Sequence, residues 1–215
     1  MNKTLKVAFF LIVVKPIILV ALGLNIVNRE KLPISGNCIV AANHNSHLDT
    51  MILMSLFPLS RLHKVRPVAA ADYFLRNRFL TWFFLNVVGI IPIDRKVTRE
   101  SRESVLDDCK VALENGEVLI IFPEGSRGEP EVMGTIKKGI YHLVKEDPQR
   151  FVLPVMMRGL GMALPKGTAL FVPFNCDVIV GEPVRDFSSS DDYVSEMKRQ
   201  YRELGERCIV QPVSK

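Results

Sequence analysis

The sequence lacks several features that would place it in common functional classes. Its four cysteines, Cys38, Cys109, Cys176 and Cys208, form no C-x-x-C pair and have no metal-ligand spacing. It has no Lys/Arg-rich tract, no zinc-finger pattern and no RNP-like aromatic pattern, which argues against nucleic acid as a partner. We therefore expect reduced thiols in a cytosol-facing protein with no resident metal.

The sequence also lacks an uninterrupted apolar run long enough to span a membrane. Residues 7–27 are hydrophobic, but Lys15 and Pro16 interrupt them near the middle. A central lysine costs roughly 2.5–3.5 kcal/mol on insertion, and proline removes a helical hydrogen bond. Three interpretations stay open: a kinked helix in one leaflet or at the interface, a poor transmembrane anchor, and a cleaved signal peptide. The last has least support, because no small-x-small cleavage site follows.

The remaining composition favours a membrane-associated protein. The chain is 48% hydrophobic with a net charge of +5, which suits an acidic membrane surface or phosphorylated substrates. Residues 72–85 mix arginines with aromatic side chains, as at a headgroup boundary, although a half-buried helix explains them equally well. We expect residues 1–27 to form a hydrophobic membrane-associated helix and residues 28–215 to form one further domain.

Short runs rich in Val and Ile alternate with helix-like stretches through the rest of the chain. The runs cover residues 38–43, 65–70, 89–93, 117–122, 151–157 and 176–180. Most lack a period of two, which is typical of strands buried on both faces. The intervening helices are expected within 48–57, 72–86, 98–116, 136–147 and 188–208. The pattern predicts an α/β fold with a mixed, largely parallel sheet flanked by helices.

Three of the predicted strands end in unusually polar turns. The turns cover residues 44–49, 94–96 and 123–128. Ligands gather at the carboxyl ends of strands in open α/β sheets, so parallel strands would bring these turns to one edge. That edge would hold a histidine, carboxylates and two arginines.

The first turn contains a candidate general base. On a continuous helix, His44 and Asp49 would diverge, because five residues turn the helix by an angle that separates their side chains. They meet only if His44 lies in the loop and Asp49 in the first helical turn. Ser46 and Asp49 form an S-x-x-D capping pattern that favours this arrangement. Helix capping alone is an equally good explanation of Asp49 when this turn is taken by itself.

The other two turns offer cations for an anionic ligand. Arg95 follows a predicted strand and suits bidentate phosphate binding, although a surface pair with Asp94 explains it as well. Gly125 permits a tight turn between Glu124 and Arg127, where the alternative is an ordinary loop with a local ion pair.

Taken together, these turns resemble the signatures of the glycerophospholipid acyltransferase family. N-H-x-S-x-x-D is met by Asn43, His44, Ser46 and Asp49; G-x-I-P-x-x-R by Gly89, Ile91, Pro92 and Arg95; F-P-E-G-x-R by Phe122 to Arg127. A fourth, weaker signature is the hydrophobic run Val152–Val155 around Pro154. The resemblance covers roughly residues 17–205 and departs from the family at no signature position.

The resemblance implies an O-acyltransferase with acyl-CoA or acyl-ACP as co-substrate and no cofactor. The acceptor would be a phosphate-bearing glycerolipid, with 1-acyl-glycerol-3-phosphate ahead of glycerol-3-phosphate or another lysophospholipid. His44 and Asp49 would be catalytic, and Arg95, Glu124, Gly125 and Arg127 would bind the acceptor and its phosphate. Asn43, Ser46 and Lys137 are the predicted supporting residues. The active site would face the cytoplasm at a membrane, with membrane lipids as partners; no motif bears on the oligomeric state.

Two rival classes are weighed against the acyltransferase. A metal-dependent hydrolase would use His44, His47 and Asp49, but H-x-x-H-x-D matches none of the common zinc patterns. A non-catalytic lipid-binding protein would keep the fold and bind lipid without His44. An imidazole has an ordinary pKa near about 6.5, so a base that removes the acceptor proton directly is chemically reasonable. Ser126 lacks the G-x-S-x-G setting of a nucleophile.

Overall fold

The computed structural model describes residues 1–33, 36–46, 48–74, 77–94, 106–128, 131–163 and 174–211. These residues contain a seven-stranded sheet with the order β1-β7-β6-β2-β5-β3-β4. The strands are β1 (Leu22–Val27), β2 (Cys38–Ala42), β3 (Val65–Ala70), β4 (Ile91–Ile93), β5 (Val118–Ile121), β6 (Phe151–Arg158) and β7 (Phe174–Val180). All six strands predicted from the Val/Ile-rich runs are present.

The sheet is mixed and largely parallel, as predicted. Neighbouring strands run parallel except for β6 and β7, which are antiparallel. Strand β2 lies in the middle, between β6 and β5. Because β2, β5, β3 and β4 point the same way, the turns that follow β2 and β5 leave the sheet at one edge.

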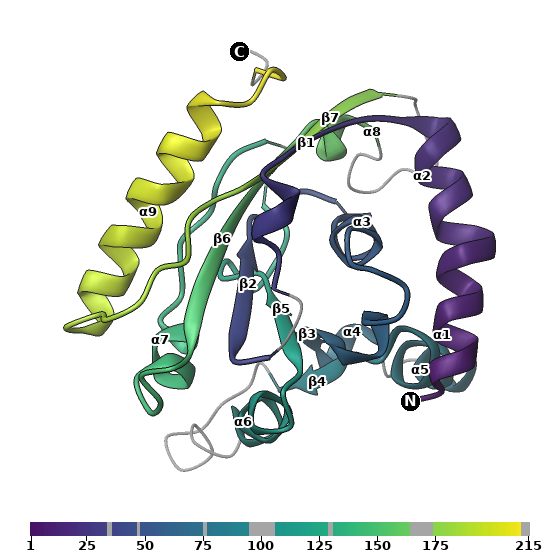
Figure 1. The fold of residues 1–215 in the computed structure, drawn as a ribbon, viewed down its shortest axis with the longest axis horizontal. Helices are drawn as coiled ribbons and strands as arrows, with labels where there is room; N and C mark the ends of the chain where they lie inside the picture. The colour runs from purple at the N-terminus through teal and green to yellow at the C-terminus, as the bar shows by residue number, and fades with distance from the viewer. Residues whose placement is uncertain are drawn as a thin grey trace.

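Helices cover both faces of the sheet (Figure 1). One face carries α1 (Lys3–Phe9), the π-helix η1 (Phe10–Val14), α2 (Lys15–Ala21), α3 (Asp49–Ser55), α4 (Ala71–Phe74), α5 (Arg78–Phe83) and the π-helix η4 (Phe84–Val88). The other carries α6 (Asp107–Glu114), α7 (Gly139–Val144) and α9 (Ser190–Glu206). Short helices η2 (Arg29–Lys31), η3 (Leu62–Lys64) and α8 (Leu160–Ala163) lie in connections.

The central strand is buried on both faces, which explains why its sequence shows no alternation. Val40 packs in the core layer under α3, whereas its neighbours Ile39 and Ala41 pack in the layer under α9. All three side chains are fully buried. A strand of this kind needs apolar residues at every position, because each of its faces packs against helices.

The N-terminal helix is shorter than predicted. It ends at Ala21, and residues 22–27 form β1 at the edge of the sheet instead of continuing the helix to residue 27. Strand β1 pairs in parallel with β7, and Asn25 Nδ2 donates to Asp177 Oδ1 at 2.7 Å. The prediction was wrong because a short apolar run does not distinguish helix from strand by itself. A separate domain for residues 1–27 stays a prediction.

Within the described residues, no helix combines the length and the apolar character needed to cross a bilayer. Lys15 begins α2 and Pro16 is its second residue. The π-helix η1 comes immediately before, so the three helical segments follow one another without a loop. The predicted helix within 72–86 is likewise divided, into α4, α5 and η4. The predicted helix within 98–116 is described only from residue 106, with α6 at Asp107–Glu114.

Candidate active site

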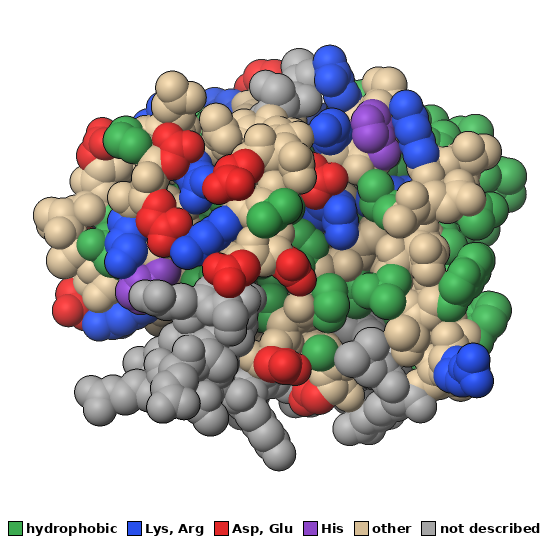
Figure 2. All heavy atoms as spheres, turned by 90° about the horizontal axis from the view of Figure 1, so that it is seen from below, with side chains coloured by type: hydrophobic (Ala, Val, Ile, Leu, Met, Phe, Trp, Pro, Cys, Tyr) green, Lys and Arg blue, Asp and Glu red, His purple; other side chains and the backbone are tan. Residues whose placement is uncertain are grey.

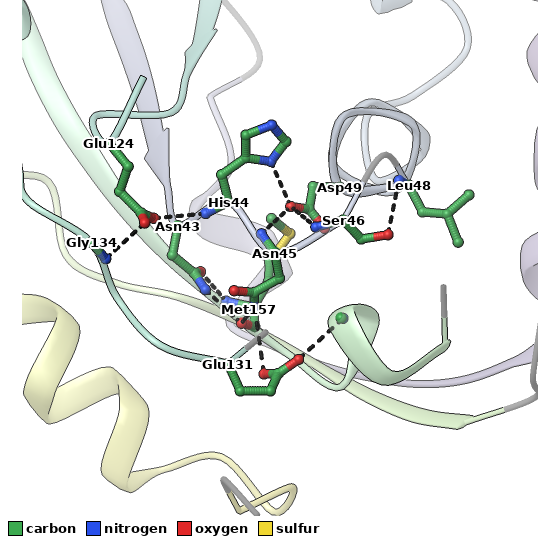
Figure 3. Close-up of polar contacts among 11 residues, drawn as sticks. Asn43, His44, Asn45, Ser46, Leu48, Asp49, Glu124, Glu131, Gly134 and Met157 are labelled. Atoms are coloured by element: carbon green, nitrogen blue, oxygen red, sulfur yellow. Dashed lines mark hydrogen bonds and ion pairs between the residues drawn. The ribbon is translucent and has the colours of Figure 1, made fainter. Parts of the chain in front are cut away.

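The polar turn after β2 is fixed to the end of β6 by its asparagine side chains (Figure 3). Asn43 Nδ2 donates to the Met157 carbonyl at 2.8 Å, and Met157 N–H donates back to Asn43 Oδ1 at 2.7 Å. Asn45 Nδ2 donates to the same carbonyl at 3.0 Å. Both amides are almost fully buried. The turn therefore leaves the sheet in one defined direction.

The predicted contact between His44 and Asp49 is present. His44 lies in the loop, Asp49 is the first residue of α3, and His44 Nδ1 lies 2.8 Å from Asp49 Oδ2. The same oxygen accepts the backbone N–H groups of Asn45 at 2.6 Å and Ser46 at 2.8 Å. Asp49 is fully buried. One carboxylate oxygen thus binds the backbone of the turn before α3 and orients the imidazole. The helix begins at Asp49 with Leu48 as its N-cap and without a side-chain capping bond, so the S-x-x-D pattern does not act as a helix cap here.

One face of the His44 ring is held by packing. Its ring stacks on Phe122 at the end of β5, with 4.0 Å between centroids and 16° between planes. The His44 side chain is 19% exposed. Because Asp49 occupies Nδ1, the second ring nitrogen points away from Asp49, as Figure 3 shows. With the proton on Nδ1, that nitrogen carries a lone pair that is free to accept a proton.

Glu124 binds the backbone on both sides of the site. Its Oε1 accepts the His44 N–H at 2.8 Å, and its Oε2 accepts the Gly134 N–H at 2.7 Å. Burial raises the pKa of Glu124, and the His44 and Gly134 N–H groups oppose that rise by stabilising the carboxylate. The geometry gives this side chain a role in holding the turn. The acceptor-binding role that the sequence assigns to it stays a prediction.

Gly125 and Lys137 meet beside Glu124. Gly125 has a φ of +71°, a conformation that favours glycine. A Cβ at that position would lie 2.5 Å from Lys137 Nζ, so the ammonium group lies directly over the glycine backbone. Arg127 is half-buried two residues further along. Gly125 and Arg127 therefore occupy the turn after β5, next to the turn that carries His44, and Lys137 reaches over Gly125 from the segment before α7. Arg95 lies outside the described residues.

Several residues at the site were given no role by the sequence. Phe122 supplies the surface on which His44 stacks, and Asn45 and the Met157 carbonyl fix the turn. Glu131 accepts the Gly161 N–H at 3.1 Å and lies 3.4 Å from Asn45 Nδ2. Asn45 stands in a turn that is conspicuous in the sequence. Nothing local marks Glu131, because its partners come from distant segments.

The described part of the chain contains no group of three His, Cys, Asp or Glu side chains arranged to hold a metal ion. His47, which the metal-dependent alternative requires, lies outside the described residues.

Comparisons with known proteins agree with the motifs. A family model described as Acyltransferase matches residues 23–158. The "1-acyl-sn-glycerol-3-phosphate acyltransferase LPAT1, chloroplastic" of Arabidopsis thaliana is 26% identical over 182 residues, which is 84% of this chain and 48% of that protein. The "1-acyl-sn-glycerol-3-phosphate acyltransferase" of Bacillus subtilis is 26% identical over 163 residues, 75% of this chain and 74% of that protein.

The fold is also similar to a solved one. The crystal structure of the 1-acyl-sn-glycerophosphate (LPA) acyltransferase PlsC from Thermotoga maritima superimposes with a TM-score of 0.72 and 21% identity. The match covers 97% of this chain and 81% of that one. The chain spans about half the length of several curated relatives that it matches. It covers 48% of the Arabidopsis protein, and 40% and 47% of the 1-acyl-sn-glycerol-3-phosphate acyltransferases of Chlamydomonas reinhardtii and Brassica napus.

Proposed function

The chain belongs to the acyltransferase family, and on that basis we propose that it is a membrane-associated O-acyltransferase acting on glycerolipids. The acyl donor is acyl-CoA or acyl-ACP, and the acceptor is 1-acyl-glycerol-3-phosphate, which becomes phosphatidic acid. The relatives named above carry that acceptor in their names. Glycerol-3-phosphate and other lysophospholipids are the alternative acceptors. The observation that carries the proposal is the His44–Asp49 bond at 2.8 Å, which directs the outer ring nitrogen away from the carboxylate.

The proposed reaction is direct transfer with a general base. The outer nitrogen of His44 removes the proton from the acceptor hydroxyl while its oxygen attacks the thioester carbonyl carbon. The new C–O bond forms, the tetrahedral intermediate collapses, and the C–S bond breaks. The imidazolium then gives its proton to the departing thiolate. Asp49 holds Nδ1–H throughout and stabilises the imidazolium by its charge.

The acceptor phosphate needs fixed cations near the imidazole. Lys137 lies over Gly125, and Arg127 follows in the same turn. Glu124 joins this turn to His44 through its backbone bond, so cation and base belong to one rigid unit. Guanidinium and ammonium groups suit a phosphate monoester. We assign acceptor binding to Arg127 and Lys137, together with Arg95. Arg95→Ala should chiefly raise the KM for the phosphate-bearing acceptor.

An apolar surface on α1, η1, α2 and α5 supports membrane association. Ile12 is 70% exposed, Leu19 84%, Val20 87%, Phe79 69% and Trp82 48%. Phe9 of α1 meets Phe83 of α5 edge to face at 5.1 Å between centroids, so the helices share one surface. Figure 2 shows hydrophobic side chains along the right edge of the molecule, where Figure 1 has α1 and α2. A surface of this kind suits the boundary between headgroups and acyl chains.

An acceptor panel with radiolabelled acyl-CoA and acyl-ACP tests the activity. Wild-type protein should acylate 1-acyl-glycerol-3-phosphate faster than glycerol-3-phosphate or other lysophospholipids. His44→Ala should lose about 10²–10⁴-fold in turnover while remaining folded. His142→Ala, which removes an exposed histidine on α7, is the control. Near-normal turnover by His44→Ala would exclude His44 as the general base. If the wild type binds lipid but transfers no acyl group, the protein is the non-catalytic alternative.

Vesicle sedimentation tests the membrane surface. Wild-type protein should sediment with vesicles of phosphatidylcholine and phosphatidylglycerol, because the exposed apolar side chains insert among the headgroups. The pair Leu19→Asp and Val20→Asp should remain in the supernatant. Ile209→Asp changes a residue that is 76% exposed near the C-terminus and serves as the control. If the double variant sediments as the wild type does, α2 is not part of the attachment.

A further inference from the structure

Glu131 contacts the catalytic turn at the Asn45 side chain, whereas Glu124 contacts it at the His44 backbone, as Figure 3 shows. Its Oε1 accepts the Gly161 N–H at 3.1 Å, and its Oε2 lies 3.4 Å from Asn45 Nδ2. Glu131 itself has a φ of +63°, which is uncommon for a residue with a side chain. The backbone is held in this conformation while the carboxylate reaches both partners.

Asn45 connects that carboxylate to the imidazole. Its backbone N–H donates to Asp49 Oδ2 at 2.6 Å, and its side-chain amide donates to the Met157 carbonyl at 3.0 Å. The second amide hydrogen is therefore available for Glu131. A change in the direction of this side chain would turn the Asn45 backbone and weaken its bond to Asp49. The position of His44 depends on that same carboxylate oxygen.

Glu131 also places a carboxyl group beside the turn. Burial raises the pKa of Glu131, while the N–H groups of Gly159 and Gly161 favour its ionised form. Among the described residues, Asp49 from α3 and Arg158 at the end of β6 act electrostatically on Glu131, while Glu124, Arg127 and Lys137 lie at the adjoining turn after β5. An additional negative charge near a turn that must carry an imidazolium favours that cation.

We propose that Glu131 is a positioning residue for His44, which acts through the Asn45 amide and through its negative charge; this role rests on the acyl transfer proposed above. Its hydrogen bonds go to Asn45 and Gly161, and not to the imidazole. Its two bonds join the catalytic turn to the start of α8, so the turn is held on both sides by carboxylates. Glu124 holds the His44 backbone, and Glu131 holds the Asn45 side chain.

Two variants separate the hydrogen bond from the charge. Glu131→Gln keeps an oxygen that can accept from Asn45 but removes the charge, whereas Glu131→Ala removes both. We expect Glu131→Ala to lower kcat by about tenfold with KM for the acceptor changed by less than about twofold. Glu131→Gln should retain most of the kcat at high pH, while the acidic limb of its kcat/KM profile moves to lower pH, because a lost negative charge makes the imidazolium less stable.

Asp177→Ala is a matched control. Asp177 is also buried and accepts from an asparagine amide, Asn25 Nδ2 at 2.7 Å, and from a backbone N–H, that of Val210 at 2.7 Å. No hydrogen bond of Asp177 reaches the catalytic turn in the part of the chain that the structure describes. Its loss should lower the melting temperature and leave kcat within about twofold of the wild type.

The role of Glu131 is contradicted if Glu131→Ala keeps wild-type kcat, or if Asp177→Ala loses as much kcat as Glu131→Ala does. Equal losses in both Glu131 variants with an unmoved acidic limb would also exclude it. The midpoint of the His44 ring titration, followed by NMR, gives an answer without turnover: Glu131→Gln should lower it, and an unchanged midpoint would exclude the electrostatic part. A wild type that transfers no acyl group would instead defeat the proposed function, while the NMR result still stands.

Discussion

Asp49→Asn is the substitution that most directly tests how the site is built. Asp49 Oδ2 accepts from His44 Nδ1, Asn45 N–H and Ser46 N–H, at 2.8, 2.6 and 2.8 Å. An asparagine oxygen can still accept the two backbone N–H groups, so the turn should persist. What it cannot supply is the negative charge. The substitution therefore separates the role of the side chain in holding the turn from its role beside the imidazole.

The expected loss of activity follows from the distance. Two unit charges about 4 Å apart interact by roughly 4 kcal/mol at an effective dielectric constant of about 20. Each factor of ten in rate corresponds to about 1.4 kcal/mol, so loss of the charge beside the imidazolium should lower kcat by about 10²–10³-fold. Each hydrogen bond to the oxygen weakens by about 1 kcal/mol when its charge is removed, and relief from burying a carboxylate offsets part of this. The free energy of unfolding should fall by about 1–3 kcal/mol.

Steady-state kinetics and urea unfolding of the same preparations measure both effects. His44→Ala should lose activity with a much smaller change in stability, because it breaks only one of the three bonds to Asp49. Asp192→Asn is the control, since Asp192 accepts the Ser188 N–H at 2.8 Å at the start of α9 with no histidine as its partner. It should lower stability and leave kcat unchanged. If Asp49→Asn folds and keeps kcat within about tenfold of the wild type, the carboxylate has no electrostatic role in the reaction.

Three further substitutions test the surroundings of the site. Tyr193→Phe should raise the free energy of unfolding by up to about 1 kcal/mol, because the buried hydroxyl finds no partner among the described residues. Tyr201→Phe should lower it by about 1 kcal/mol, because it removes the 2.9 Å bond to the Ala41 carbonyl. Urea unfolding measures both, and a change of the same sign in the two variants would contradict this difference between the hydroxyls. Burial lowers the pKa of Lys6 to about 7, so between about pH 7 and 10 the unfolded chain binds more protons than the folded protein does. The free energy of unfolding should therefore rise with pH in that window, and Lys6→Met should flatten the rise. An unchanged slope in the variant would show that Lys6 is not the source of the pH dependence. Gly125→Ala should lower both the melting temperature and kcat, because the backbone has a φ of +71° and a Cβ would displace Lys137. A melting temperature by circular dichroism and a kcat that both equal those of the wild type would refute this.

The strands and the catalytic turn were predictable from local sequence. Runs of Val and Ile gave all the strands except β1, because a strand buried on both faces needs apolar residues at each position. The contact between His44 and Asp49 was predictable because it requires only that His44 lie in the loop and Asp49 in the first turn of the helix, and α3 does begin at Asp49. These are properties of a few neighbouring residues, so the chain need not be folded to show them.

The segment 22–27 could not be assigned in the same way. Its residues suit a helix or a strand, and only pairing with β7 decides between them. That pairing joins residues 152 positions apart, as in the bond between Asn25 and Asp177. Local propensity carries no information about a partner so distant in the chain.

By itself, the sequence determined the α/β class, the shared edge of the polar turns after β2 and β5, and the pairing of an imidazole with a carboxylate. Only the tertiary structure decided what holds that pair in place: Glu124 bound to the His44 backbone, Phe122 under the ring, and Glu131 beside Asn45. The physical reason is the range of the interactions. Capping and strand periodicity act between neighbours, whereas these contacts form only after strands from distant parts of the chain have come together in one sheet.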